Sequence, residues 1–320
     1  MVPEIQENVS DFIIQGLSDT PGLQLPLFVL FLIIYLFIII GNLLIFFIIL
    51  LNSDLHTPMY KFLQNLSIID ISFTTVVLPD LLHLLITKKN KISFFGCMTQ
   101  MYLYLSLNGN EYFLLMIMSY DRYVAICDPL HYINRMSEKC FAWLISAANC
   151  AGFLGSVCHV VLISKLSYCH SHLINHFFCD LIPLLKLSCS DTFIIEILTY
   201  VVGTLLAGNS FLLTLISYIY IISTILKIQS THGRQKAFST CASHLTCVII
   251  LYMTLICLYM KPTTSYSPNR DKFFSLLCIV LVPLLNPLIY TIKNKEFLIA
   301  FNKLRQKVKS FVFPDETQID

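Results

Sequence analysis

Two acidic residues, Asp70 and Glu111, stand inside long apolar stretches of the sequence. A carboxylate is costly in an apolar medium, so such residues are functional candidates. Two buried carboxylates near each other repel, share a proton or enclose a cation. Asn42 and Asn286, in other apolar stretches, carry neutral oxygens suited to the same cation. The residues leave two interpretations open: a bound ion, or one protonated acid hydrogen-bonded to an amide.

A second candidate is the triplet Asp121-Arg122-Tyr123, which follows an apolar stretch. An arginine at a helix end is able to pair with a carboxylate in one state and with a partner protein in another. The simpler interpretation is an arginine that extends its charge to the membrane surface. Pro287 lies between Asn286 and Tyr290 and predicts a kink, because proline lacks a backbone donor. Such a kink is either a hinge or a static bend.

The composition shows what must position these residues. The chain has 320 residues, of which 56% are hydrophobic and only 12% are charged. Soluble domains carry about 25% charged residues, so this chain is unable to cover a water-facing surface. Ordinary cytosolic enzymes, disordered chains and collagen-like repeats are excluded, and a net charge of +2 argues against nucleic-acid binding. A polytopic membrane protein remains.

Seven apolar stretches are long enough to cross a bilayer, which needs roughly 20 apolar residues as a helix. We predict spans at residues 26–50, 58–85, 94–120, 141–163, 193–226, 237–260 and 273–292. The second and third are the weakest, because each holds an ionisable residue. Residues 1–25 form a tail before the bundle and residues 293–320 a tail after it.

Basic residues predict the orientation. The first tail has no Lys or Arg, whereas the last contains six between Lys293 and Lys309. The last tail is therefore expected in the cytoplasm and the N-terminus outside, in a multi-pass plasma-membrane protein without a cleavable signal peptide. Asn8-Val9-Ser10 is a glycosylation acceptor in the outer tail.

The predicted outer side holds four of the twelve cysteines: Cys97, Cys169, Cys179 and Cys189. Disulfides are permitted there, with three possible pairings. A bond from Cys97 to the loop that carries the other three would hold that loop over the bundle. His170, His172 and His176 in this loop have a spacing that suits zinc or copper, but a solvated loop is the simpler interpretation.

Several strings follow one another in a specific order. They are Gly41-Asn42, LHTPMY (Leu55 to Tyr60), FLQNLSIID (Phe62 to Asp70), MSYDRYVAICDPLHY (Met118 to Tyr132), HFFCD (His176 to Asp180), Ser217-Tyr218, KAFSTCASHL (Lys236 to Leu245), KPTTSYSPNRDK (Lys261 to Lys272) and PLLNPLIY (Pro283 to Tyr290). Over residues 8–305 this pattern closely resembles the olfactory branch, class II or tetrapod type, of the rhodopsin-like G-protein-coupled receptors.

Three departures from that pattern stand out. Ser119 replaces the usual alanine of MAYDRY, and Leu251-Tyr252-Met253 replaces Phe-Tyr-Gly. Ile292-Lys293-Asn294 replaces Leu-Arg-Asn. The missing glycine is expected to alter packing or bending of the sixth span, and the main constellation is intact.

The resemblance implies an all-α fold, a seven-transmembrane helix bundle with a short cytoplasmic amphipathic helix. It implies disulfides Cys97–Cys179 and Cys169–Cys189. It also implies a sodium ion, the one cofactor expected, near Asp70, with Glu111, Asn42 and Asn286 as further ligands. Asp121, Arg122, Tyr123, Tyr218, Pro287 and Tyr290 would form the switch that couples to a G protein.

The implied function is binding of a small, mostly apolar odorant in the outer half of the bundle, followed by activation of a stimulatory olfactory-type G protein that raises cyclic AMP. The predicted pocket residues share helix faces and are Met101, Tyr104, Leu105, Asn108, Gly109, Val202, Leu206, Leu255, Ile256, Tyr259, Leu276 and Ile279. The span-three face has no Asp, which disfavours an amine ligand.

The sequence disfavours two other classes of membrane protein. A transporter or channel would favour internal repeats, broken helices or several midplane charges. The sequence offers only Asp70 and Glu111 and shows no repeat. A membrane enzyme would favour motifs such as His-Glu-x-x-His or Gly-x-Ser-x-Gly, and neither is present. We therefore predict a receptor in membrane lipid rather than an enzyme.

Overall fold

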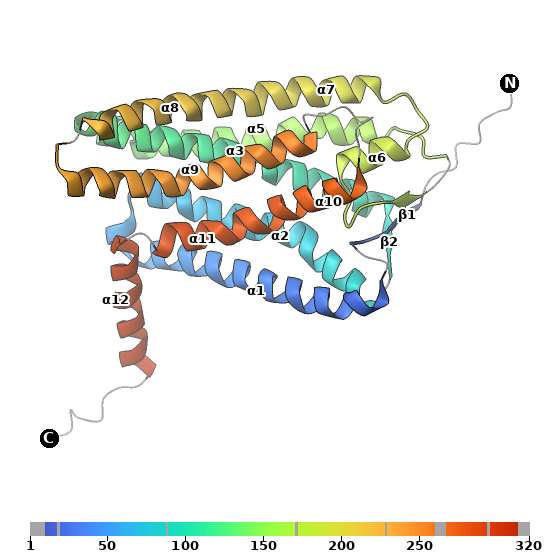
Figure 1. The fold of residues 1–320 in the computed structure, drawn as a ribbon, viewed down its shortest axis with the longest axis horizontal. Coiled ribbons are helices and arrows are strands. Elements are labelled where there is room, and N and C mark those ends of the chain that lie inside the picture. The colour runs from blue at the N-terminus through green and yellow to red at the C-terminus, as the bar shows by residue number, and fades with distance from the viewer. Residues whose placement is uncertain are drawn as a thin grey trace.

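The computed structural model is an elongated bundle of roughly parallel and antiparallel helices (Figure 1). It describes residues 10–17, 20–87, 89–169, 172–227, 229–259, 267–292 and 295–312. A small sheet lies at one end, here named the sheet end. Helix α12 (Lys295–Val312) crosses the other end at a steep angle to the bundle, and this is named the α12 end.

Seven helical units run along the bundle in the described part of the chain. They are α1 (Pro21–Leu51), α2 (Pro58–Thr87), α3 (Phe94–Cys127), α5 (Glu138–Ile163), α7–η3–α8 (Phe193–Gly203, Thr204–Gly208, Asn209–Leu226), α9 (Thr231–Tyr259) and α10–η5–α11 (Pro268–Leu276, Leu277–Leu281, Val282–Ile292). This arrangement confirms the predicted seven-helix bundle. By length and hydropathy, α1, α2, α5 and α8 each qualify as membrane-spanning.

Short elements join these units. They are η1 (Ser53–Leu55), η2 (Pro129–His131) and α4 (Tyr132–Arg135) at the α12 end, and α6 (Leu181–Leu187) at the sheet end. Local capping explains two of the helix starts. The side chains of Ser93 and Ser137 accept hydrogen bonds from Gly96 N and Cys140 N, which satisfies free amides at the starts of α3 and α5.

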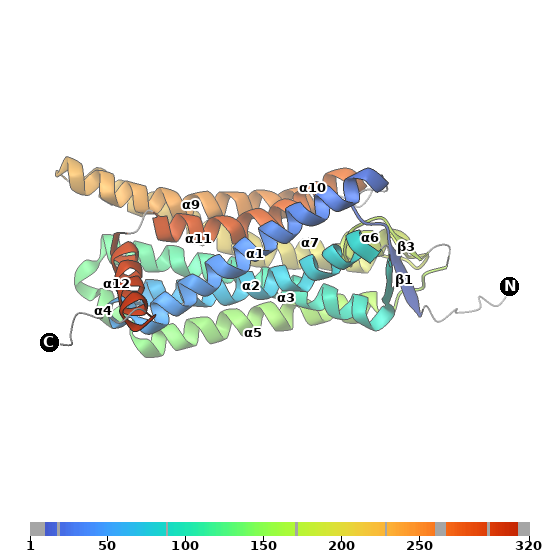
Figure 2. The same ribbon diagram turned by 90° about the horizontal axis from the view of Figure 1, so that it is seen from below.

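Helix α3 lies inside the bundle and packs against α2, α5 and α8, while α1 packs against α2 and α11 (Figure 2). The side chains of Phe73, Tyr104 and Met118 are fully buried in this core. The outer face of α1 exposes apolar side chains such as Phe37 and Ile40, as expected of a surface that faces lipid. Close packing also explains Gly41, because a Cβ there would lie 3.2 Å from Pro287 Cβ on α11.

Two units contain a π-helical segment, η3 and η5, within otherwise α-helical spans. Such segments insert an extra residue into a turn and are frequent at functional sites. Pro287 lies nearly two turns beyond η5, inside α11. The sixth and seventh units thus differ in regularity, since α9 is a continuous α-helix and the seventh unit is interrupted by η5.

The sheet was not predicted from the sequence. Strand β1 (Asp11–Ile14) pairs antiparallel with β2 (Lys91–Ser93) and parallel with β3 (Leu173–Ile174), giving the order β2-β1-β3. Phe12 of β1 is fully buried and packs edge-on against Tyr168, with ring centroids 5.1 Å apart. This aromatic anchor fixes the N-terminal segment against the loop between α5 and α7.

Candidate functional site

A cavity of about 130 Å³ opens between α3, α5, α7 and α9 towards the sheet end. Its wall is mostly apolar, with a few polar side chains, which is typical of a small-molecule site. The side chains of α3 on this wall are Leu105, Asn108, Gly109, Tyr112 and Phe113. An empty cavity of about 150 Å³ is large enough for benzene, so this one suits a compact molecule.

Six of the predicted pocket residues lie on this wall. They are Leu105, Asn108, Gly109, Val202, Leu255 and Tyr259. Tyr259 is held by a buried hydrogen bond of 3.0 Å from its hydroxyl to Asp180 Oδ1. Of the five residues predicted on α3, three border this cavity: Leu105, Asn108 and Gly109.

The other predicted residues lie elsewhere. Met101, Tyr104 and Ile279 are fully buried in the core, and Leu276 is partly buried against it. Tyr104 packs against Phe73 and Phe178, with ring centroids 5.1 and 4.7 Å away. The side chain of Ile256 is 50% exposed and faces outward. The side chain of Leu206 falls outside the described part of the structure.

The sequence interpretation missed the contribution of α5. Ala151, Gly152, Gly155, Ser156 and His159 line the cavity from this helix, together with Thr199 of α7. In the sequence these α5 residues recur at intervals of three and four, which places the small side chains and His159 on one helix face. That signal would have identified α5 as a wall of the cavity.

The two buried acids lie in one polar cluster. Asp70 and Glu111 are fully buried and close enough to interact electrostatically. Asn286 Nδ2 donates to Asp70 Oδ2 at 2.9 Å, and Asn42 Nδ2 donates to the carbonyl oxygens of Ile38 and Pro283. The structure thus joins α1, α2, α3 and α11 through the predicted set.

Several oxygens of this cluster have no hydrogen-bond partner among the described residues. They are Asp70 Oδ1, both carboxyl oxygens of Glu111, Asn42 Oδ1 and Asn286 Oδ1. Buried polar atoms are almost always paired in native proteins. A set of unpaired oxygens with two carboxyl groups is the donor set that a hard cation prefers, so these residues fit a sodium ion.

At the α12 end, Arg122 is held by its neighbour. Its Nη2 donates to Asp121 Oδ2 at 2.8 Å and its Nε donates to the same oxygen at 3.2 Å. The Tyr132 hydroxyl donates to Asp121 Oδ1 at 2.8 Å. Burial, and next the negative charge of Asp121, raise the pKa of Tyr132. The carboxyl group is fully buried, whereas Arg122 keeps about a fifth of its side chain accessible.

Of the remaining switch residues, Tyr218 lies close enough to Arg122 for an electrostatic interaction. Tyr218 is buried, and its hydroxyl donates to the Cys241 carbonyl oxygen at 3.4 Å, which links α8 to α9. Tyr123 packs against Tyr120 and Tyr220. Pro287 is buried against Gly41, and the side chain of Tyr290 lies outside the described residues. Asp128 lies next to this region, and its hydrogen bond from His131 lowers its pKa.

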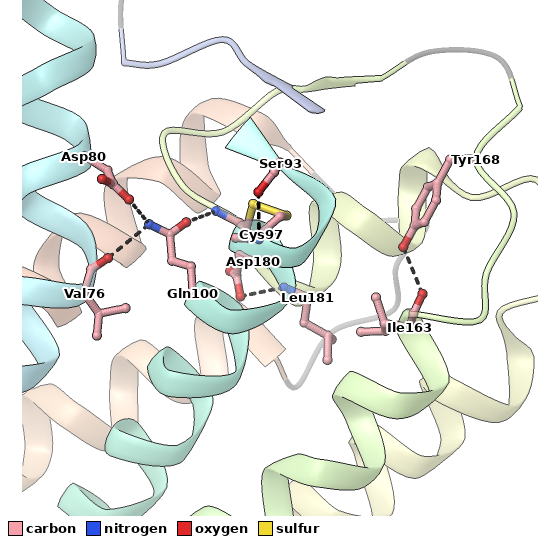
Figure 3. The surroundings of a disulfide bond; sticks show 11 residues. Val76, Asp80, Ser93, Cys97, Gln100, Ile163, Tyr168, Asp180 and Leu181 are labelled. Carbon is pink, nitrogen blue, oxygen red and sulfur yellow. Dashed lines mark hydrogen bonds between the residues drawn. A yellow bond between two sulfur atoms is a disulfide. The ribbon is translucent and has the colours of Figure 1, made fainter. Parts of the chain in front are cut away.

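Disulfides hold the loop between α5 and α7 over the sheet end. Cys97 pairs with Cys179, and Cys169 pairs with Cys189, as the sequence prediction has it. Gln100 strengthens the first link, because its Oε1 accepts from Cys179 N while its Nε2 donates to Asp80 Oδ2 and Val76 O (Figure 3). Asp80 had no predicted role, yet it connects α2 to this network.

His176 is a residue of this same loop. Its imidazole is fully buried and packs against Phe177 and Phe178, with Ser275 Oγ 3.5 Å from its Nε2. Burial, together with the nearby Lys272 charge, lowers its pKa to about 3. Such a ring is neutral and serves packing. His172 packs edge-on against Phe12, while His170 and Asn8 lie outside the described residues.

Comparison with known proteins agrees with this geometry. The olfactory receptor family model matches residues 31–307. Olfactory receptor 8H1 of Homo sapiens is 48% identical over 304 residues, covering 94% of this chain and 96% of that protein. Olfactory receptor 8G50 of Mus musculus is 45% identical over 310 residues, covering 96% and 98%. A bundle with a small apolar cavity near one end and a buried Asp-Arg pair near the other, matched over nearly its whole length, makes this chain a member of the olfactory receptor family.

Proposed function

We propose that this receptor binds a small, mostly apolar odorant in the cavity between α3, α5, α7 and α9 and activates a stimulatory, olfactory-type G protein that raises cyclic AMP. The sheet end faces the exterior of the plasma membrane, and the α12 end faces the cytoplasm. The observation that carries the proposal is the cavity wall, which combines an apolar surface with the buried carboxamide of Asn108.

The same helices connect the cavity to the switch. Helix α3 carries Asn108 in the cavity wall and Arg122 at its other end, and α9 carries both Tyr259 and Cys241. A ligand shifts a two-state equilibrium only by its difference in affinity for the two states. In the proposed mechanism the odorant favours the packing in which α9 moves away from α3 and Arg122 meets a helix of the G protein.

A sodium ion is proposed as a stabiliser of the resting state. Asp70, Glu111, Asn42 and Asn286 would hold it, because they present the unpaired oxygens described above. When bound, the ion supplies positive charge that permits both acids to remain ionised. The cluster bridges α1, α2, α3 and α11. A bound ion that holds its four side chains in place would therefore favour one packing of these helices.

The alternative, a transporter or channel, has less support. The cavity lies towards one end of the bundle, and the two acids of the polar cluster are fully buried between helices. Ion flux across vesicles that contain the purified chain would support that alternative.

A cyclic-AMP reporter in cells that express the full chain tests the proposal against a panel of small apolar odorants. At least one odorant is expected to raise the signal. Arg122→Ala is expected to abolish the response while the receptor still reaches the cell surface. A response that survives this substitution would contradict the proposed G-protein contact, and Arg135→Ala, on the neighbouring helix α4, is the matched control.

A further inference from the structure

Helix α8 ends and α9 begins at the α12 end of the bundle (Figure 1). A cavity of about 450 Å³, named here the α8–α9 groove, lies between their adjoining turns. Its apolar wall consists of Ile222, Ile225 and Leu226 of α8 and Phe238 of α9. The side chains of Leu226 and Phe238 are 67% and 56% exposed, so the groove is open rather than enclosed. It shares no residue with the odorant cavity.

The polar residues of the groove lie together at its rim. Thr231, Arg234 and Gln235 have exposed side chains in the first turns of α9, and each carries a hydrogen-bond donor. Phe238 and Ile222 lie about one turn deeper, because α9 runs from this end into the bundle and α8 runs towards it. The groove is therefore graded from a polar rim to an apolar interior, as an amphiphile is graded from head to tail.

The charge at this rim is positive. The sequence has no Asp or Glu between residues 197 and 270, whereas Lys227, Arg234 and Lys236 fall close together within that stretch. Neither Lys227 nor Arg234 has an ion-pair partner among the described residues. The rim is therefore ready to receive an anion.

The acids at the nearby end of α3 leave this charge unbalanced. Asp121 already pairs with Arg122 at 2.8 Å, and Asp128 pairs with Arg135 at 3.0 Å. A guanidinium group without a carboxylate partner suits a phosphate, which it binds through two parallel hydrogen bonds.

Lys227 marks the level of the groove in the membrane. Helix α8 contains no charged residue, and Lys227 is the first charge that follows it. Basic residues that directly follow an apolar span lie at the level of the lipid head groups. The rim of the groove therefore lies among the head groups, and its apolar wall lies beside the acyl chains.

We propose that the α8–α9 groove binds an anionic phospholipid, with the head-group phosphate at Arg234 and one acyl chain along Ile222, Ile225 and Phe238. A free phosphate would match the rim but would leave the apolar wall uncovered. The proposal goes beyond the proposed signalling and takes from it only the cytoplasmic orientation of the α12 end. The cytoplasmic leaflet is the one that carries anionic lipids.

The test adds phospholipids to the purified full chain in detergent and follows thermal unfolding as a function of lipid concentration. The probes are phosphatidylinositol bisphosphate and phosphatidylserine, with phosphatidylcholine and soluble inositol trisphosphate for comparison. Each basic residue at the membrane surface contributes about fivefold in affinity, so Lys227 and Arg234 predict roughly 25-fold greater potency for the anionic lipids than for phosphatidylcholine. Equal potency of phosphatidylcholine, or of inositol trisphosphate, would overturn the proposal.

Variants locate the effect. Arg234→Gln is expected to weaken the anionic lipids about fivefold and to leave phosphatidylcholine unchanged. Phe238→Ala is expected to weaken the anionic lipids as well, because it removes part of the apolar wall. Arg305→Gln is the matched control, since it removes the same charge from an exposed position of α12 at the same end. An equal loss in Arg305→Gln would show a diffuse attraction to the surface and would refute the groove.

A helix of the G protein is the other candidate occupant. Weaker G-protein binding in Arg234→Gln and Phe238→Ala, with no effect of anionic lipid, would assign the groove to the protein partner and overturn the proposal. Stabilisation by lipid needs neither odorant nor G protein. A receptor that signals but shows no lipid preference would therefore contradict the lipid site alone, and a lipid-stabilised receptor without a cyclic-AMP response would contradict the signalling alone.

Discussion

The hydroxyl of Tyr132 donates a hydrogen bond of 2.8 Å to Asp121 Oδ1, and Arg122 binds the other oxygen of that carboxylate. Helix α4 therefore holds the carboxylate in the orientation that retains Arg122. Tyr132 is thus part of the proposed switch, although the sequence interpretation did not include it.

Tyr132→Phe is expected to raise signalling in the absence of ligand. Loss of the hydrogen bond destabilises the resting arrangement, in which Asp121 retains Arg122, by about 1 kcal/mol. This corresponds to roughly a fivefold shift in the two-state equilibrium. The measurement is basal cyclic AMP normalised to surface expression. Tyr120→Phe, whose ring stacks on Tyr123, is the control, and an unchanged basal signal in Tyr132→Phe would show that α4 has no role.

Sodium is expected to stabilise the purified chain relative to choline at equal ionic strength. The gain is on the order of 1 kcal/mol when sodium is a few times above its Kd. Asp70→Asn and Glu111→Gln should each remove it, because each takes one charge from the cluster. Asp128→Asn, an acid in the loop after α3, should keep the difference. A sodium effect that persists in Asp70→Asn would refute the ion site.

Gly152→Ala is expected to lower surface expression and thermal stability. A Cβ at this position would lie 1.8 Å from Asn110 Oδ1 and 2.8 Å from the Ser106 carbonyl oxygen, so α5 would be forced away from α3. Overpacking of this kind costs about 1–3 kcal/mol. Gly22→Ala adds a methyl group with no atom within 4 Å and should be neutral. Equal stability of the two variants would contradict the close packing of α3 and α5.

Acidification is expected to destabilise the chain through His176. The native pKa is about 3 and the ordinary value is 6.5, so the unfolded state binds the extra proton. Stability is therefore constant above pH 6.5 and falls as the pH drops towards 3. From pH 7.5 to pH 5 the loss is on the order of 2 kcal/mol.

His176→Phe should flatten this dependence, because a phenylalanine ring takes up no proton and suits the surroundings of Phe177 and Phe178. The Lys272 charge and the Ser275 hydroxyl, which face His176, then have no titrating partner at this position. His83→Phe, at an exposed position of α2, is the control. Thermal unfolding at both pH values provides the measurement, and an unaltered slope in His176→Phe would assign the effect to other groups.

Most of the bundle was predictable because the spans differ sharply in hydropathy from the segments between them. The ends of the helices were less so. Helix α3 continues to Cys127, beyond the predicted end at residue 120, because Asp121 is buried by Tyr132 and Arg122 instead of facing water. Hydropathy alone treats such a carboxylate as the end of a span.

The site was predictable where helical spacing decides which face points inward, as it does for Asn108 and Tyr259. It was not predictable where contacts with neighbouring helices decide whether a side chain borders the cavity or is buried in the core. Tyr104 shares the face of Leu105 and Asn108, yet Phe73 and Phe178 enclose it. The three-stranded sheet escaped prediction for a similar reason, because its strands are short and come from distant segments.

Strand β1 is synthesised before either of its partners. β2 follows only after α1 and α2, and β3 only after α3 and α5, so the edges of β1 stay open while those helices emerge from the ribosome. The sheet is therefore completed only after Ile174 has been synthesised, when the first half of the receptor is available. A chain that stops before Tyr168 would leave the ring of Phe12 without Tyr168 and His172, which cover it in the complete structure.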